Sequence, residues 1–260
     1  MPTPLVVGVM LRVHARPTTT DIILNEFEDL NRDLKDILFR VHVWADRPTD
    51  AVSRVLDRHR HSLVGIDLSP YSLVSHGGER YMSAANDQLK ILRTRCSVLD
   101  WICYHDDDNW LEPLGARREL PRALSDDSVD VWSARTLFFH NHPDTINLSR
   151  EHCSPLFFRN VENDWFPRNR ITNATDGVND DAIARDRIRV LLTPLLDYGT
   201  YSDEERTRVH SSYLAAGKDD AFTRSAAPSF KPILAKVANH IHHPWRDLFS
   251  ETLKSTNGRS

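Results

Sequence analysis

Short apolar runs alternate with amphipathic stretches along the first 105 residues of the chain. Runs of strand length, rich in valine and isoleucine, occupy residues 5–13, 37–45, 62–69 and 98–105. The stretches between them, at 16–37, 46–61 and 79–96, carry apolar side chains at helical spacing, with Thr20 as the expected N-cap of the first. Alternation of strand and helix predicts a parallel α/β sheet.

The pattern weakens after about residue 115. Residues 129–139 predict another strand, while residues 140–170 read as irregular because prolines and asparagines interrupt them. Residues 180–192 and 202–217 predict helices, the second with Gly217 as its C-cap. Since the chain shows no internal repeat and no low-complexity linker, we expect one compact domain.

The amino-acid composition limits the classes of protein to which the chain can belong. Hydrophobic residues make up 40% of the chain and charged residues 27%, and the formal net charge is −4. These values are ordinary for a globular protein and give no overall basic field for nucleic acid. The chain has no apolar run long enough to span a membrane and no signal peptide at its start, so we expect a cytoplasmic protein. Its three cysteines are unclustered and show no metal-ligand spacing.

The stretch "YHDDDNWLEP" at residues 104–113 carries the main chemical signal. It places Asp106, Asp107 and Asp108 side by side, directly after a predicted buried strand. Ligands of α/β sheets bind beyond the carboxyl ends of the strands, and adjacent carboxylates repel one another unless a cation neutralises them. Alternate residues of an extended segment point the same way, so Asp106 and Asp108 are expected to share a Mg²⁺ or Mn²⁺ ion that also grips a diphosphate. The alternative is a solvated acidic loop.

The order of several motifs carries a family resemblance. The acid run follows "HARP" with Arg16, an aspartate-rich turn that contains Asp46, and a helix "GGERYMSAANDQL" that contains Asn86. In this order the motifs resemble those of the family 2-like glycosyltransferases with the GT-A fold. The resemblance covers roughly residues 5–115. A weaker match continues at "DGVNDDAIARDRI", residues 176–188.

The resemblance implies a single GT-A-type α/β domain with a mostly parallel central sheet flanked by helices. Residues 1–115 would form the nucleotide-sugar-binding half, residues 116–250 the acceptor and catalytic half, and residues 251–260 a polar tail. The implied cofactor is Mn²⁺ or Mg²⁺, and the donor is a UDP- or GDP-sugar.

The resemblance also assigns roles to particular residues. Asp181, or else Asp180, would be the general base of an inverting transfer, and His242 or His243 would complete the metal site of Asp106 and Asp108. The residues expected to contact the donor nucleotide are Asp46, Arg16, Arg12, Asn86 and Asp107.

Other interpretations of these residues stay open. Asp46 is alternatively a helix-capping turn residue, the acidic pair a helix N-terminal charge, the histidines a surface cluster, and Trp110 a core residue. A non-catalytic sugar-nucleotide-binding or scaffolding protein is the main alternative function. A nucleotidyltransferase is disfavoured because "LRVHARPTTT", residues 11–20, has no glycine. The acceptor is open among a glycan, a metabolite, a protein and modified bases in DNA, and so is the oligomeric state.

Overall fold

A computed structural model describes residues 3–69, 79–150, 152–161, 185–199, 201–215, 221–225, 227, 229–237 and 241. The elements, in chain order, are β1 (Leu5–Val13), α1 (Pro17–Asp33), β2 (Ile37–Ala45), α2 (Asp50–His59), η1 (Arg60–Ser62), β3 (Leu63–Leu68), α3 (Glu79–Arg95), β4 (Trp101–Asp106), β5 (Asn109–Leu111), α4 (Pro113–Leu124), β6 (Val131–Phe138), β7 (Thr145–Asn147), β8 (Cys153–Arg159), η2 (Arg185–Arg187), β9 (Ile188–Asp197), α6 (Asp203–Ala215), α7 (Ala221–Ser225) and β10 (Leu234–Lys236).

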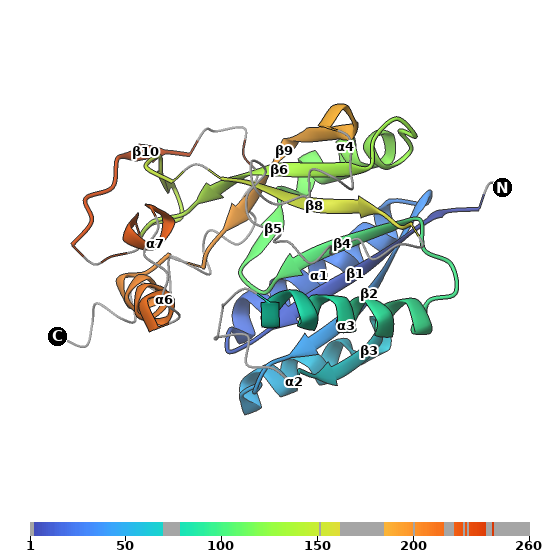
Figure 1. Cartoon of the computed structure of the whole chain (residues 1–260), viewed down its shortest axis with the longest axis horizontal. Helices are drawn as coiled ribbons and strands as arrows, with labels where there is room; N and C mark the ends of the chain where they lie inside the picture. The colour runs from blue at the N-terminus through green and yellow to red at the C-terminus, as the bar shows by residue number, and fades with distance from the viewer. Residues whose placement is uncertain are drawn as a thin grey trace.

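Most of the described strands form one sheet in the order β3-β2-β1-β4-β8-β6-β9-β5, and β7 and β10 form a separate ribbon. Within the described residues, four neighbouring pairs of the large sheet are parallel and three are antiparallel. The fold class predicted from the sequence, an α/β domain with a mostly parallel central sheet flanked by helices, is therefore confirmed. The sheet runs without interruption from the N-terminal strands, blue to green in Figure 1, to the orange β9.

The two faces of the first four strands are covered by different helices. Val7, Val9 and Leu11 of β1 belong to the core that α1 covers, whereas Met10 belongs to a second cluster with residues of α3. This alternation is the period of two that a strand buried on both sides requires. Gly8 faces α3 so closely that a Cβ there would lie 2.8 Å from the Leu92 side chain. Figure 1 shows α3 in front of this part of the sheet.

Helix α1 begins earlier than the sequence prediction. Pro17 is its first residue and Arg16 its N-cap, so the predicted N-cap at Thr20 is wrong. A proline suits the first helical position because its fixed φ is already helical and its missing N–H would have no partner there. The Thr20 hydroxyl instead donates back to the Arg16 carbonyl oxygen at 2.7 Å.

The second half contains strands that the sequence analysis missed. Strand β8 and the short β7 lie within residues 140–170, which were expected to be irregular. The predicted helix at 180–192 is wrong over its described part, because Arg185–Arg187 is a 3₁₀ turn and β9 begins at Ile188. β9 pairs in parallel along β6, from Val131 opposite Ile188 to Phe138 opposite Asp197. Tertiary pairing has overridden the helical spacing of a short apolar run.

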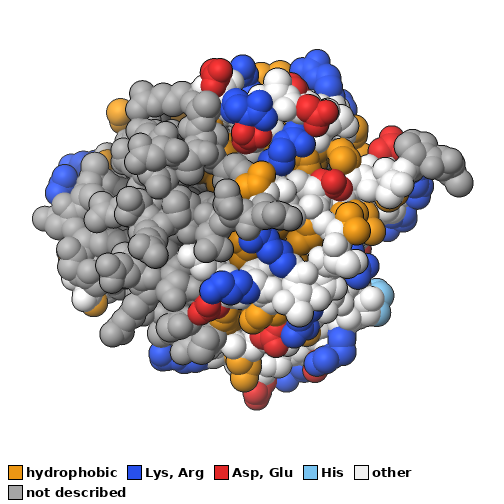
Figure 2. All heavy atoms as spheres, turned by 45° about the vertical axis from the view of Figure 1, so that its right-hand side comes forward, with side chains coloured by type: hydrophobic (Ala, Val, Ile, Leu, Met, Phe, Trp, Pro, Cys, Tyr) orange, Lys and Arg blue, Asp and Glu red, His pale blue; other side chains and the backbone are white. Residues whose placement is uncertain are grey.

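The described helices and the visible surface agree with the composition. None of the described helices is long and apolar enough to cross a membrane. On the face shown in Figure 2, the coloured part of the surface carries Lys and Arg side chains intermixed with Asp and Glu side chains. No single sign of charge dominates that part of the face.

Candidate active site

Parallel strands bring polar residues to one edge of the sheet. Arg12 of β1 lies beside Asp106 of β4 in the strand register, and the neighbouring Val13 lies beside Ala45 at the end of β2. The loops that follow these strands carry Arg16 and Asp46. The carboxyl edge therefore gathers the motifs that the sequence analysis singled out, which is where ligands bind in α/β sheets.

Asp106 ends β4, and Asp107 and Asp108 form the tight turn that leads into β5; the three residues together are called the acid turn. Asp107 is 4% exposed and accepts a hydrogen bond from the His14 backbone N–H at 2.7 Å. Asp106 has a 42% exposed side chain and forms an ion pair with Arg12, while the Asp108 side chain is 18% exposed. The middle carboxylate is turned inward, and the outer two are the more accessible.

Arg16 is the cation that holds this turn. Its Nη1 atom donates to Asp108 Oδ2 at 2.7 Å and to Asp107 Oδ1 at 3.1 Å, and its Nη2 atom donates to Glu205 Oε2 at 3.1 Å. Burial opposes the charge of Arg16 and is the largest single influence on its pKa, but Asp108, Asp107 and Glu205 together raise that pKa. Arg16 therefore ties the acid turn to α6, across a wide sequence separation.

Asp197, at the end of β9, is a carboxylate that the sequence analysis did not select. The Tyr198 N–H, next to it in the chain, donates to the Asp108 carbonyl oxygen at 2.8 Å, and Asp197 Oδ1 accepts from the Gly199 N–H at 2.9 Å. A Cβ at Gly199 would lie 2.4 Å from Asp108 Oδ2, so only glycine allows this close approach. Burial raises the pKa of both carboxyls, and the charge of Asp197 adds to the rise at Asp108.

Asp46 is more deeply buried than expected for a residue that contacts a nucleotide directly. It is 1% exposed, its carbonyl oxygen is 2.9 Å from His14 Nδ1, and its Oδ2 atom is 3.5 Å from the same nitrogen. The alternative role of capping the next helix belongs to another residue, because Thr49 Oγ1 accepts from the Val52 N–H at 3.3 Å. His14, with a 29% exposed ring, is the more accessible member of the pair.

Three other candidates have clear positions. The guanidinium of Arg12 lies 4.7 Å from the centre of the Tyr104 ring. Asn86 is half-buried on α3. Trp110 is 1% exposed and stacks on Tyr198 with ring centres 4.9 Å apart, so it is a core residue and not a free stacking platform.

Several candidates lie outside the described residues. They are Asp180 and Asp181, the two candidates for the general base, and His242 and His243, the proposed metal ligands. Their roles stay predictions.

The acid cluster suits a divalent cation by its donor chemistry. Asp106, Asp108 and Asp197 offer the hard oxygen ligands that Mg²⁺ and Mn²⁺ prefer. Crowding and burial hinder full ionisation of these carboxyls, and positive charge relieves that repulsion. In this structure Arg12 and Arg16 supply the charge, and no three His, Cys, Asp or Glu side chains among the described residues converge as a metal site.

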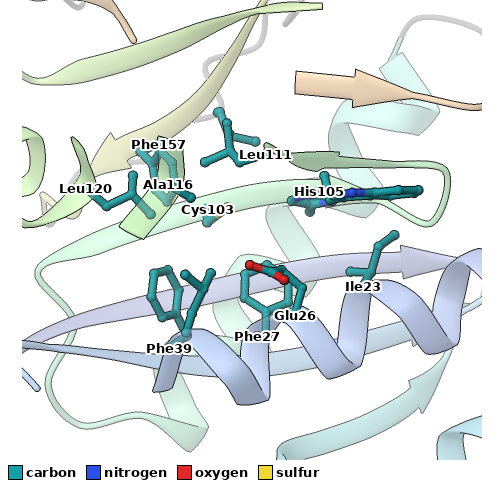
Figure 3. Close-up of a pocket in the computed structure, with 13 residues that line it drawn as sticks. Ile23, Glu26, Phe27, Phe39, Cys103, His105, Leu111, Ala116, Leu120 and Phe157 are labelled. Carbon is teal, nitrogen blue, oxygen red and sulfur yellow. The ribbon is translucent and has the colours of Figure 1, made fainter. Parts of the chain in front are cut away.

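A small cavity lies between α1 and the sheet, apart from the acid turn. Figure 3 shows the Glu26 carboxyl turned from α1 toward the space bordered by Cys103 and His105. The cavity measures about 20 Å³, which is room for about one water molecule. Burial raises the pKa of Glu26 to about 7, although Arg117 Nη1 donates to it at 2.6 Å and opposes the rise. Burial likewise lowers the pKa of His105.

Comparisons with known proteins give limited similarity. No protein-family model and no curated protein matches the sequence. Among solved structures, S. aureus TarS 1-349 aligns with 85% of this chain and 69% of its own, with 14% identity and a TM-score of 0.45. The chain covers 42% of a longer TarS structure.

Two further neighbours are synthases of glycosylated phosphoglycerate. Glucosyl-3-phosphoglycerate synthase from Mycobacterium tuberculosis, in complex with Mn²⁺, UDP and glucosyl-3-phosphoglycerate, aligns with 83% of this chain and 81% of its own, with 11% identity and a TM-score of 0.45. Mannosyl-3-phosphoglycerate synthase from Rubrobacter xylanophilus covers 52% of this chain and 41% of its own, with 21% identity and a TM-score of 0.35. Identities and TM-scores this low do not assign a family.

Proposed function

We propose that this protein is a metal-dependent glycosyltransferase that moves a sugar from a nucleotide-sugar donor to a hydroxyl acceptor. The observation that carries the proposal is the acid turn at the carboxyl end of β4, where Asp106, Asp107 and Asp108 meet Arg12 and Arg16. Mixed carboxylates and guanidiniums at such an edge suit a diphosphate and its counter-cation. The order of the sequence motifs points to the same chemistry.

The outer carboxylates would hold Mn²⁺ or Mg²⁺. Asp106 and Asp108 are the more accessible members of the turn, and His242 or His243 stays the proposed additional ligand. When bound, the metal supplies Lewis-acid stabilisation of the negative charge on the leaving diphosphate. Asp197 lies beside Asp108 and adds a further oxygen donor to the cluster.

Other residues would position the donor. Arg12 and Arg16 offer guanidinium donors at the same edge, and either can hydrogen-bond phosphate oxygens if its carboxylate partner is taken up by the metal. Asp46 and Asn86 are proposed to act on the nucleoside side, with Asp46 acting through His14, which covers it.

The transfer needs a base on the acceptor side. The acceptor hydroxyl oxygen attacks the anomeric carbon and forms the new C–O bond, while the bond to the diphosphate breaks and its electron pair leaves with the nucleoside diphosphate. Asp181, in preference to Asp180, takes the hydroxyl proton. A single displacement of this kind inverts the configuration of the anomeric carbon.

Thermal unfolding with a panel of UDP-, GDP-, TDP- and CMP-sugars, each with and without Mn²⁺, tests the proposal. Binding to the folded state stabilises it by about 2.7 kcal/mol at a hundredfold excess over Kd. We expect one nucleotide to raise Tm only with Mn²⁺, and Asp108→Asn to abolish that rise. Asp57→Asn, at an exposed position on α2, is the matched control and keeps it.

The outcomes separate the proposed function from its alternative. If no donor raises Tm of the folded protein, the proposal is wrong. If a donor binds with Mn²⁺ but neither Asp181→Asn nor Asp180→Asn changes the slow hydrolysis of that donor by water, the protein is a sugar-nucleotide-binding protein without this catalysis.

A further inference from the structure

A large groove is lined by residues of α4, β6, β9 and the β7–β10 ribbon, elements whose places in the fold Figure 1 shows. Its volume is about 760 Å³, within the usual range of binding pockets. Leu137, Ile146, Leu148 and Leu192 contribute apolar side chains to it. Leu192 is 89% exposed and Leu148 49% exposed, so this apolar surface is open to solvent. Contiguous exposed apolar surface of this kind marks interaction sites.

Basic side chains surround the apolar part of the groove. They are Arg118 and Arg122 of α4, Arg135 of β6 and Lys236 of β10. Arg118 and Arg122 are four residues apart, so they lie on one side of the helix. No carboxylate from the described residues pairs with Arg122 or Lys236 within the groove, and both are exposed.

The two acidic side chains of the groove are already engaged by the protein. Glu112 caps α4, where it accepts from the N–H groups of Leu114 and Gly115. Glu119 accepts from the N–H groups of Leu192 and Thr193, both at 2.8 Å. Arg122 and Lys236 therefore offer positive charge to a ligand, while the carboxylates of Glu112 and Glu119 already accept hydrogen bonds from backbone N–H groups of the protein.

We propose that this groove binds a protein segment in which acidic side chains alternate with apolar ones. An apolar centre with a rim that includes arginine is the usual composition of a protein–protein interface. A flat bilayer does not fill a concave groove. Single-stranded nucleic acid is disfavoured, since none of the described lining residues is an aromatic on which bases stack. The proposal is independent of the glycosyltransferase activity.

Fluorescence polarisation with a labelled peptide of alternating glutamate and leucine tests the inference on the full chain. We expect saturable binding that weakens with added salt, and at least a tenfold weaker affinity for Arg118→Glu/Arg122→Glu. The matched control is Arg40→Glu/Arg54→Glu, which reverses two exposed arginines elsewhere and keeps the affinity. Circular dichroism confirms that each variant is folded.

Two further binding measurements distinguish the apolar from the electrostatic part of the interaction. Leu192→Ser is expected to weaken binding without changing its salt dependence, because it removes apolar contact only. A peptide of alternating lysine and leucine is expected not to bind. Absence of binding by the acidic peptide, or equal loss in both charge-reversal pairs, overturns the inference. Sedimentation with vesicles of phosphatidylcholine and phosphatidylglycerol that depends on Arg118 and Arg122, without peptide binding, overturns it in favour of an anionic lipid.

Discussion

Replacing Arg16 by methionine is expected to destabilise the protein strongly. The methionine keeps an unbranched side chain but removes the cation that neutralises Asp107, Asp108 and Glu205. The Arg16 side chain is only 17% exposed, so this is the loss of one partner from a buried ion network. Such losses cost about 3–5 kcal/mol, because Asp107 and Asp108 stay buried without this cation, whereas Glu205 keeps its ion pair with Arg208.

Urea denaturation measures this cost, and Arg32→Met is the matched control on the same helix. The Arg32 side chain is 67% exposed and pairs with Asp29, so its loss should cost at most about 1 kcal/mol. The cost of Arg16→Met should shrink as the pH falls, because the pKa of Asp108 is already raised and its protonation removes the uncompensated charge. Equal costs for the two variants, or a cost at Arg16 that does not vary with pH, would refute the reasoning.

Three further predictions concern carboxyl groups whose pKa values are shifted in the folded protein. The pKa of Glu26 is raised to about 7, so its stabilising contribution is fully present below its ordinary pKa and is lost as the pH rises through 7. Glu26→Gln should therefore gain stability relative to the wild type as the pH rises from 5 to 8 in urea titrations. Parallel curves of unfolding free energy against pH for the two proteins would contradict this. Gly199→Ala should abolish any Mn²⁺-dependent rise in Tm, because the new Cβ displaces the Asp108 carboxylate. Asp21 accepts from His59 at 2.8 Å and its pKa is lowered, so the stability advantage over Asp21→Asn should be present at neutral pH and vanish as the pH falls through that lowered pKa.

The local pattern of apolar and polar residues was sufficient to predict the main strands and helices in the first half of the fold. The predicted strands at 5–13 and 37–45 match β1 and β2, because apolar side chains fill most positions of a strand that is covered on both faces. The prediction for the second half of the fold failed where strands are short or pair antiparallel in the middle of the sheet. β8 lies between β4 and β6, and its local sequence does not predict that it pairs with those two strands.

The candidate site was partly visible for the same reason. Strand-end reasoning located Asp106, Asp107 and Asp108, and the structure brings Arg12 and Arg16 to them. It would also have pointed to Asp197, which follows an apolar run, if residues 180–192 had not been interpreted as a helix. Glu205 was not accessible to such reasoning, since its approach to Arg16 depends on where α6 packs.

The central claim is that the acid turn binds a divalent cation together with a nucleoside diphosphate. Electron paramagnetic resonance of Mn²⁺, titrated with the protein in the presence of UDP or GDP, tests it most directly. We expect the signal of free Mn²⁺ to fall with the wild type, to fall further when one of the two nucleotides is added, and to stay unchanged with Asp106→Asn/Asp108→Asn. Loss of the signal in that double variant to the same extent as in the wild type would contradict the account, as would no loss with the wild type at all.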